Sequence, residues 1–275
     1  MANLKAVYDR PLKGLDTLGH ELSFYIKVLL ALPRSVMHYP REILRILAEV
    51  TLGSGALAVI GGTVGVIIGM TFFTGAQVGL SGYAALNQLG TAAFAGFVSA
   101  YFNTREIAPL VAGIALAATV GCGFTAQLGA MRISEEIDAV EVMAIPSMQF
   151  LVTTRVVGGL IAIVPLYVVG LLSSYVASRL VVTQFYGQSS GTYDHYFNQF
   201  LPPGDVLWSF GKVLVFAVVV ILIHCYHGYT ASGGPAGVGV AVGKAVRTSI
   251  VAINVIDLFL SMAIWGASTT VRLAG

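Results

Sequence analysis

Long stretches without a charged side chain dominate the chain. No charged residue occurs between Val50 and Thr104, a stretch that would extend about 80 Å as a single helix, against a hydrocarbon core of about 30 Å. Residues 75–103 contain Gln77 and Asn87, and the pattern leaves open whether they are re-entrant, interfacial or part of a span. Five segments are predicted to cross a bilayer: residues 53–74, 105–131, 150–182, 206–230 and 248–271.

The first fifty residues follow a different pattern, in which apolar positions recur at helical spacing among charged ones. Leu18, Leu22 and Ile26 lie on one side of the predicted helix, and Glu21 and Lys27 lie elsewhere. Such amphipathic helices lie along a membrane surface, so residues 15–50 are predicted to be interfacial helices. Seven of the 15 basic residues precede position 50, which predicts a cytoplasmic N-terminus by the positive-inside rule.

Composition agrees with the hydrophobic pattern. The 275 residues are 56% hydrophobic and 10% charged, with a mean hydropathy of +0.83, whereas a soluble domain carries about 25% charged residues. A net charge of only +2 gives no footprint for nucleic acid. The chain is therefore predicted to be an all-α, multi-pass integral membrane protein with a single domain, in which residues 183–205, rich in Gly, Ser and Tyr, form an external loop.

An acidic segment interrupts this apolar sequence. The stretch RISEEIDAVEVMAIP covers residues 132–146 and holds four acids within seven residues: Glu135, Glu136, Asp138 and Glu141. Ser134 is a suitable N-cap for a short helix, and Pro146 ends it. The residues alone allow either a helix that docks on a soluble partner or a solvated loop.

Three motifs carry a resemblance to a known family. They are REIAP at residues 105–109, FTAQLGAMRISEEIDAVEVMAIPSMQFLVTTRV at residues 124–156 and GYTASGGPAGVGVAVGKAV at residues 228–246. Their wording, order and spacing resemble the MlaE/YrbE permease family, and most closely the B-type YrbE subunits of actinobacterial Mce systems. The resemblance covers the chain from about residue 15 to its end.

The resemblance implies a permease subunit of an ABC-type lipid transporter rather than an enzyme. Such a chain forms half of a transmembrane pathway for hydrophobic substrates such as fatty acids, mycolic-acid-like lipids or sterols, and works in import. Its implied partners are an A-type YrbE permease paralogue, a cytosolic ABC ATPase dimer and Mce-family lipid-binding proteins. The implied location is the plasma (inner) membrane, and this chain binds no cofactor, because ATP and Mg belong to the ATPase.

Within that family, the acidic segment is the coupling helix that enters the ATPase. The resemblance therefore implies a cytoplasmic coupling helix at residues 134–145. The residues expected to contact the ATPase are Ser134, Glu135, Glu136, Asp138, Val140, Glu141 and Met143.

Other residues suggest further roles in the membrane. Arg105 and Glu106 are charges at the outer mouth of a span, where they either snorkel to the interface or form a gate or polar collar. Asp257 is deeper, and its partner could be Lys212 or a tyrosine. Four aromatic side chains either line a cavity for acyl chains or face lipid: Phe72, Phe73, Phe94 and Phe97.

Small residues on the first span predict close packing against another helix, and that helix could belong to the second subunit of a dimer. Gly61, Gly65 and Gly69 form overlapping GxxxG patterns on one helix face.

Two apparent sites do not fit their chemistry. His224, Cys225 and His227 have no nearby carboxylate or further cysteine, so no metal site is predicted. The nearest phosphate-loop candidate has Val238 where a glycine is required and Ala245 where Ser or Thr is required, so no nucleotide site is predicted.

The chain departs from the family in the second span. Where MlaE-like subunits commonly carry Arg and Glu, this chain has Thr119 and Gln127. We therefore hypothesise that it pairs with a different permease subunit in a pseudo-twofold heterodimer. An integral-membrane lipid-modifying enzyme is the alternative function, although the sequence places no catalytic cluster near the interface.

Overall fold

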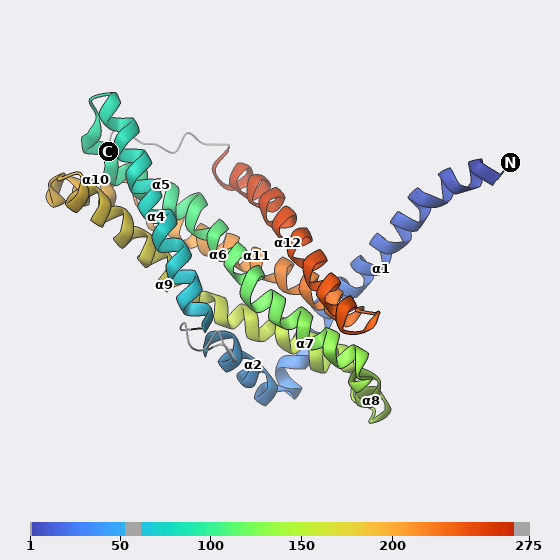
Figure 1. The fold of residues 1–275 in the computed structure, drawn as a ribbon. Coiled ribbons are helices and arrows are strands. Elements are labelled where there is room, and N and C mark those ends of the chain that lie inside the picture. Colours follow the sequence, from blue (N-terminus) through green and yellow to red (C-terminus); the bar gives the residue numbers. More distant parts are fainter. Residues whose placement is uncertain (1, 53–61, 267–275) are drawn as a thin grey trace.

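A computed structural model of the chain describes residues 2–52 and 62–266, with side chains from residue 19 onward. The described residues form helices joined by short turns, with no strand among them, which confirms the all-α membrane fold (Figure 1). Five helices are long and apolar enough to cross a membrane: Gly62–Gln88, Ala92–Ile133, Met148–Phe185, Pro203–Tyr229 and Gly234–Trp265. Between residues 2 and 52 the chain forms α1 (Ala2–His38) and α2 (Pro40–Leu52).

Three of the spans are the helices α4 (Gly62–Gln88), α11 (Pro203–Tyr229) and α12 (Gly234–Trp265). The span Ala92–Ile133 is a succession of helical segments: η1 (Ala92–Phe94), α5 (Ala95–Phe102), η2 (Asn103–Ile107), α6 (Ala108–Leu116), η3 (Ala117–Gly121) and α7 (Cys122–Ile133). The span Met148–Phe185 consists of η4 (Met148–Thr153), α9 (Thr154–Leu180) and η5 (Val181–Phe185). The segments η2, η3, η4 and η5 are π-helical, a geometry that is frequent at functional sites.

Two short helices mark opposite ends of the bundle. The helix α8 (Glu136–Val142) lies between α7 and η4, and α10 (Ser190–Gln199) lies between η5 and α11. Figure 1 shows α8 beyond the end of α7 at one end and α10 beside α5 at the other. We call these the α8 end and the α10 end.

The helix bounds differ from the sequence expectation in several places, and the second span begins at Ala92 rather than at residue 105. The predicted first span, residues 53–74, begins outside the described residues. Its helix continues to Gln88, and the polar side chains of Gln77 and Ser81 are accommodated in it by a hydrogen bond to each other. The predicted external loop, residues 183–205, contains the π-helical end of a span and the whole of α10. The last span starts at Gly234 rather than 248, because Lys244 and Arg247 are exposed on the helix surface.

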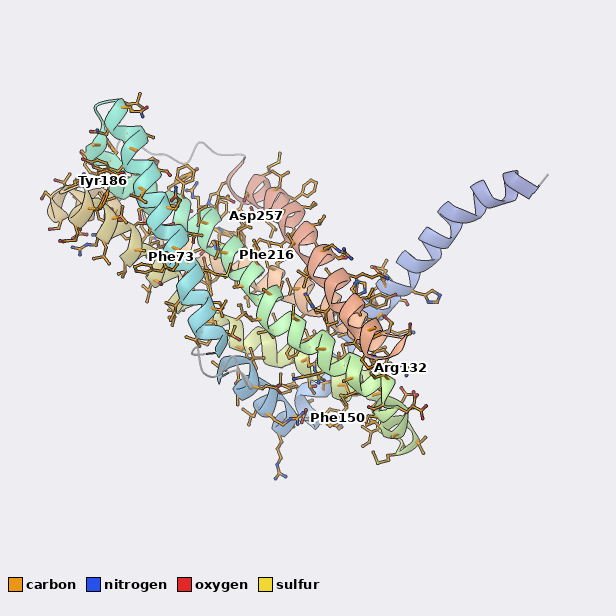
Figure 2. All side chains as sticks on the ribbon, viewed as in Figure 1. Phe73, Arg132, Phe150, Tyr186, Phe216 and Asp257 are labelled. Carbon is orange, nitrogen blue, oxygen red and sulfur yellow. The ribbon has the colours of Figure 1, made fainter. Side chains whose placement is uncertain are left out.

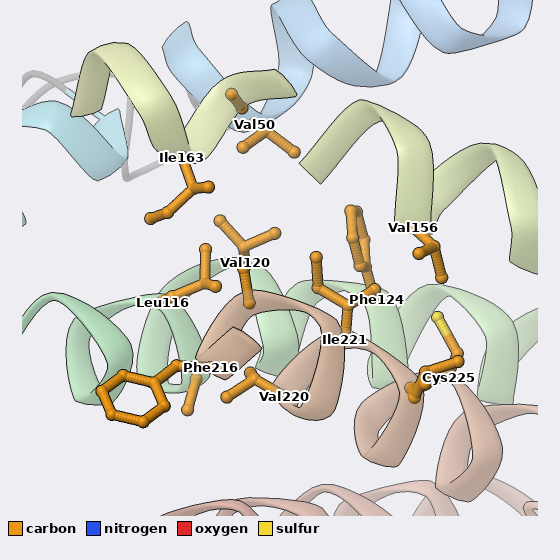
Figure 3. Packing of buried hydrophobic residues seen from close by; sticks show 14 of the residues in the cluster. Val50, Leu116, Val120, Phe124, Val156, Ile163, Phe216, Val220, Ile221 and Cys225 are labelled. Atoms are coloured by element: carbon orange, nitrogen blue, oxygen red, sulfur yellow. The ribbon is translucent and has the colours of Figure 1, made fainter. Parts of the chain in front are cut away.

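The core lies where α9, α11 and the span Ala92–Ile133 meet. Figure 3 shows Phe124 and Val120 facing Ile221 of α11, with Ile163 of α9 on the other side. Because lipid tails are as apolar as these side chains, close packing rather than water exclusion stabilises this core.

The helices α4 and α9 pack closely against each other. A Cβ at Gly75 would lie 2.5 Å from the backbone oxygen of Ser174, and one at Gly79 would lie 3.0 Å from that of Ser178. The glycines predicted for close packing lie elsewhere on the first span. Gly61 is outside the described residues, Gly65 is half-buried, and a Cβ at Gly69 would have no neighbour within 4 Å. Packing within the chain therefore uses Gly75 and Gly79, and Gly69 faces open space.

Candidate functional site

The predicted coupling helix is shorter than residues 134–145. Ser134 ends α7 and donates a hydrogen bond to the Ala130 carbonyl at 3.0 Å, so it is not the N-cap of α8. Glu135 occupies that position with a φ of 61°, in the left-handed region, and makes no capping hydrogen bond with its side chain. This left-handed residue turns the chain sharply between α7 and α8.

Both ends of α8 are fixed to the bundle. Near its start, Arg132 Nη1 lies 2.8 Å from Asp138 Oδ1. Near its end, the Ser147 hydroxyl donates to the Glu141 carboxylate and lies 2.8 Å from the Tyr229 hydroxyl. The Tyr229 hydroxyl in turn donates to Glu141 Oε1 at 3.3 Å, so one carboxylate joins α8 to the start of η4 and to the end of α11.

The outer surface of α8 is acidic and apolar. Ile137 is fully buried, whereas the side chains of Glu135 and Glu136 are exposed. Val142 is 88% exposed and Met143 63% exposed, although both are apolar. Side chains of this kind beside exposed acids are what a protein partner would bind.

The predicted coupling residues therefore divide into two groups. Asp138 and Glu141 hold α8 in place, and Ser134 hydrogen-bonds within the turn to Glu136 at 2.9 Å. Val140 is half-buried, all the other predicted residues are exposed, and Glu135, Glu136 and Met143 form the second group. Val142 was not among the predicted residues, although it lies four residues after Asp138 and therefore on the same side of α8.

A buried network of charges lies toward the α10 end. The Lys212 side chain has no exposed surface, and its Nζ lies 2.7 Å from Asp257 Oδ1 and 3.3 Å from Glu106 Oε2. The same ammonium group donates to the Arg105 carbonyl at 2.7 Å and to Ser261 Oγ at 2.8 Å. Ser261 donates to Glu106 Oε1 at 2.7 Å, which closes the network between η2, α11 and α12.

Arg105 extends this network at the start of α11. Its guanidinium lies 2.6 Å from Asp205 Oδ2 and 4.0 Å from the centre of the Tyr101 ring. Trp265 Nε1 donates to Asp205 Oδ1 at 3.0 Å, so α12 also takes part. Figure 2 shows Asp257 on α12, far from Arg132 at the α8 end.

This network brings together residues that the sequence treats separately. Arg105 and Glu106 belong to it, and of the two partners considered for Asp257 the structure has Lys212. Asp205 and Trp265 were not predicted, because each is an isolated polar group at the edge of an apolar run and only the fold brings them to Arg105.

The four candidate phenylalanines form two groups rather than one. Phe72 and Phe73 pack edge to face on α4 at 5.9 Å, and Phe73 is 75% exposed. Phe94 and Phe97 instead pack against α10 and the residue that follows it. The ring centre of Phe94 lies 4.5 Å from that of Tyr196, and the ring centre of Phe97 lies 4.8 Å from that of Phe200.

The two positions where the chain departs from the family have local partners. Thr119 donates to the Ala115 carbonyl at 2.7 Å. The Gln127 amide donates to the Glu49 carboxylate, and its oxygen accepts from Arg155 Nη2 at 3.2 Å. Gln127 thus joins α7 to α2 and α9 without a charge of its own.

Comparison with known proteins agrees with this architecture. The family model described as Permease MlaE matches residues 53–263. A protein of Rickettsia bellii named "Probable ABC transporter permease protein" is 30% identical over 191 residues, which are 70% of this chain and 74% of the relative. A Synechocystis protein of the same description is 31% identical over 158 residues, which are 58% of this chain and 60% of the relative.

A plant relative is similar over a comparable region. The Arabidopsis thaliana protein named "Protein TRIGALACTOSYLDIACYLGLYCEROL 1, chloroplastic" is 29% identical over 199 residues, which are 72% of this chain and 57% of that protein. The family match covers well over half of the chain, including α8, the first four spans and the fifth as far as residue 263. The chain therefore belongs to the MlaE permease family.

Proposed function

We propose that this chain is the permease subunit of an ABC-type lipid transporter of the Mce type, powered by a separate cytosolic ATPase. The observation that carries the proposal is α8, which is fixed at both ends and exposes Glu135, Glu136, Val142 and Met143. In this proposal the α8 end is cytoplasmic, as is the N-terminus, and the membrane is the plasma (inner) membrane.

The contacts of α8 support a lever that transmits force to three spans. Arg132 and Asp138 join it to α7, while Glu141 joins it to η4 through Ser147 and to α11 through Tyr229. When two nucleotide-bound ATPases close, a helix seated in one of them would move as a rigid body. These contacts would carry the motion to the spans directly.

The charged network supports a role as a gate near the opposite end. It holds η2, α11 and α12 together through Lys212 and Arg105, both of which are buried. Separating these helices would leave buried charges without partners, so the closed arrangement is favoured until work is done on it. In this proposal Arg105 and Glu106 belong to a polar collar that closes the pathway.

The substrate of the transporter is proposed to be a lipid. The half-buried Phe72 and the exposed Phe73 on α4 are suited to acyl chains, and the name of the Arabidopsis relative refers to a glycerolipid. Fatty acids, mycolic-acid-like lipids and sterols are the proposed substrate classes, carried inward and delivered by Mce-family proteins outside.

The second permease subunit is proposed to be an A-type YrbE paralogue. The uncharged Gln127 and Thr119 in place of a family charge pair, and the open face at Gly69 on α4, support an asymmetric dimer. ATP and Mg would be bound by the ATPase.

Copurification from native membranes tests the proposed assembly. The chain is extracted with a mild detergent, and its bound proteins and lipids are identified by mass spectrometry. We expect an ABC ATPase, a paralogous permease and a retained lipid. Recovery of the chain with neither protein would overturn the proposal.

A further inference from the structure

The helix α1 has two apolar sides along residues 19–38. One side is buried against the bundle and contains Phe24 and Val28. The other is exposed although it is apolar, with Leu22 60%, Leu30 75% and Met37 81% exposed. An exposed apolar face on an amphipathic helix indicates immersion at the level where headgroups meet acyl chains.

Two cationic side chains lie between these faces. Lys27 and Arg34 are seven residues apart, so they share one side of α1 at a separation of about 10 Å along its axis. Both are exposed, and neither side chain forms an ion pair or hydrogen bond with any residue that the structure describes.

A cavity of about 670 Å³ separates this side of α1 from the corner where α8 meets η4 and α11. Lys27 and Arg34 line it on the α1 side, and Ser147, Gln149 and Tyr229 line the opposite wall. Leu30 and Met148 add apolar surface beside these polar groups. The cavity is therefore polar in one part and apolar in another.

The charge in this cavity is positive. Glu141 is the one acid among its lining residues, and its carboxylate already accepts hydrogen bonds from Ser147 and Tyr229. Two cations thus remain for an anion, with the Gln149 side chain nearby. Basic pockets between helices at a membrane interface suit the phosphate of a lipid headgroup.

We propose that this cavity binds the headgroup of an anionic phospholipid from the surrounding bilayer. Its phosphate lies between Lys27 and Arg34, and its acyl chains run along the exposed apolar face at Leu30. The lipid is then a fixed component of the protein rather than its transported substrate. It braces α1 against Ser147 and Tyr229, the residues that hold α8.

Native mass spectrometry of the full chain, with whatever subunits copurify, tests this site. Phosphatidylglycerol and phosphatidylcholine with identical acyl chains are titrated separately, and inorganic phosphate is added as a competitor. The variant is Lys27→Gln/Arg34→Gln, which keeps the polar character of two exposed positions. We expect it to weaken phosphatidylglycerol binding roughly thirtyfold, with phosphatidylcholine binding unchanged.

The control is Arg41→Ala/Arg45→Ala, which removes two cations from α2 that do not line the cavity. It should retain the affinity of the unmodified chain for phosphatidylglycerol. An equal loss of affinity in the control would mean that phosphatidylglycerol binds through diffuse surface charge. No loss of affinity in the cavity variant would mean that the cavity is not the binding site. Either result overturns the proposal. Full displacement by millimolar phosphate would also overturn it, in favour of a free-anion site. Since the readout is binding, it is independent of transport.

Discussion

Lys212 of α11 lies 2.7 Å from Asp257 of α12, and its side chain is fully buried. This pair, with Glu106 at 3.3 Å, ties three membrane helices together through a single ammonium group. A buried charge is tolerated only when it is paired, so each member depends on the others.

Replacing Lys212 by Met should destabilise the protein by about 3 kcal/mol, because the buried carboxylate of Asp257 and the partly exposed carboxylate of Glu106 lose their cation. The thermal unfolding midpoint in detergent measures this loss. The double variant Lys212→Met/Asp257→Leu should recover part of it, since fewer unpaired charges remain. Equal stability of Lys212→Met and the unmodified chain would show that the network contributes nothing to the fold.

Gly75→Ala should destabilise the contact between α4 and α9, because its new Cβ would lie 2.5 Å from the Ser174 backbone oxygen. Overpacking of this kind costs about 1–3 kcal/mol. The matched control is Gly69→Ala on the same helix, where a Cβ meets nothing within 4 Å. Unfolding of both variants in the isolated chain distinguishes them, and similar midpoints would contradict the packing described here.

The open face at Gly69 leads to a separate prediction about assembly. Gly69→Leu should leave the isolated chain folded but weaken its association with the second permease subunit, if that face is the dimer seam. The amount of paralogue that copurifies measures the effect. Undiminished copurification would place the seam on another helix.

Tyr229→Phe should loosen α8 without unfolding the bundle, because it removes the hydroxyl that joins Glu141 to α11. We expect amide hydrogen exchange across residues 136–142 to accelerate by up to about tenfold, as loss of one hydrogen bond allows. Tyr226→Phe is the control, since the Tyr226 ring packs on Phe24 at 5.4 Å and its hydroxyl makes no described contact with α8. Equal exchange in the two variants would show that this hydroxyl does not hold α8.

Much of the fold follows from the sequence, because the bilayer imposes simple rules. The charge-free runs predict the number of spans, and the acids at residues 135–141 mark the segment between α7 and α9. The sequence fails where backbone geometry decides. The left-handed turn at Glu135 shifts the start of α8, and nothing in the residue itself predicts a positive φ.

The charged network shows a different limit. Arg105, Asp205 and Trp265 are far apart in the chain, and each lies in or beside an apolar segment. A sequence pattern identifies such groups as costly in a membrane, but only the helix packing selects their partners. The same holds for Gly75, whose importance comes from the approach of α9 and not from its spacing to other glycines.

The central claim is that the exposed surface of α8 binds the ATPase, and stimulation of ATP hydrolysis in reconstituted membranes tests it most directly. Val142→Asp/Met143→Asp places two charges on that surface, and Leu89→Asp is the control in the turn that follows α4, where the side chain is 76% exposed. The account predicts that the double variant loses stimulation about tenfold or more, as the loss of interface anchors implies, while Leu89→Asp retains it. Full stimulation by the double variant, with α8 still folded by hydrogen exchange, would contradict the account.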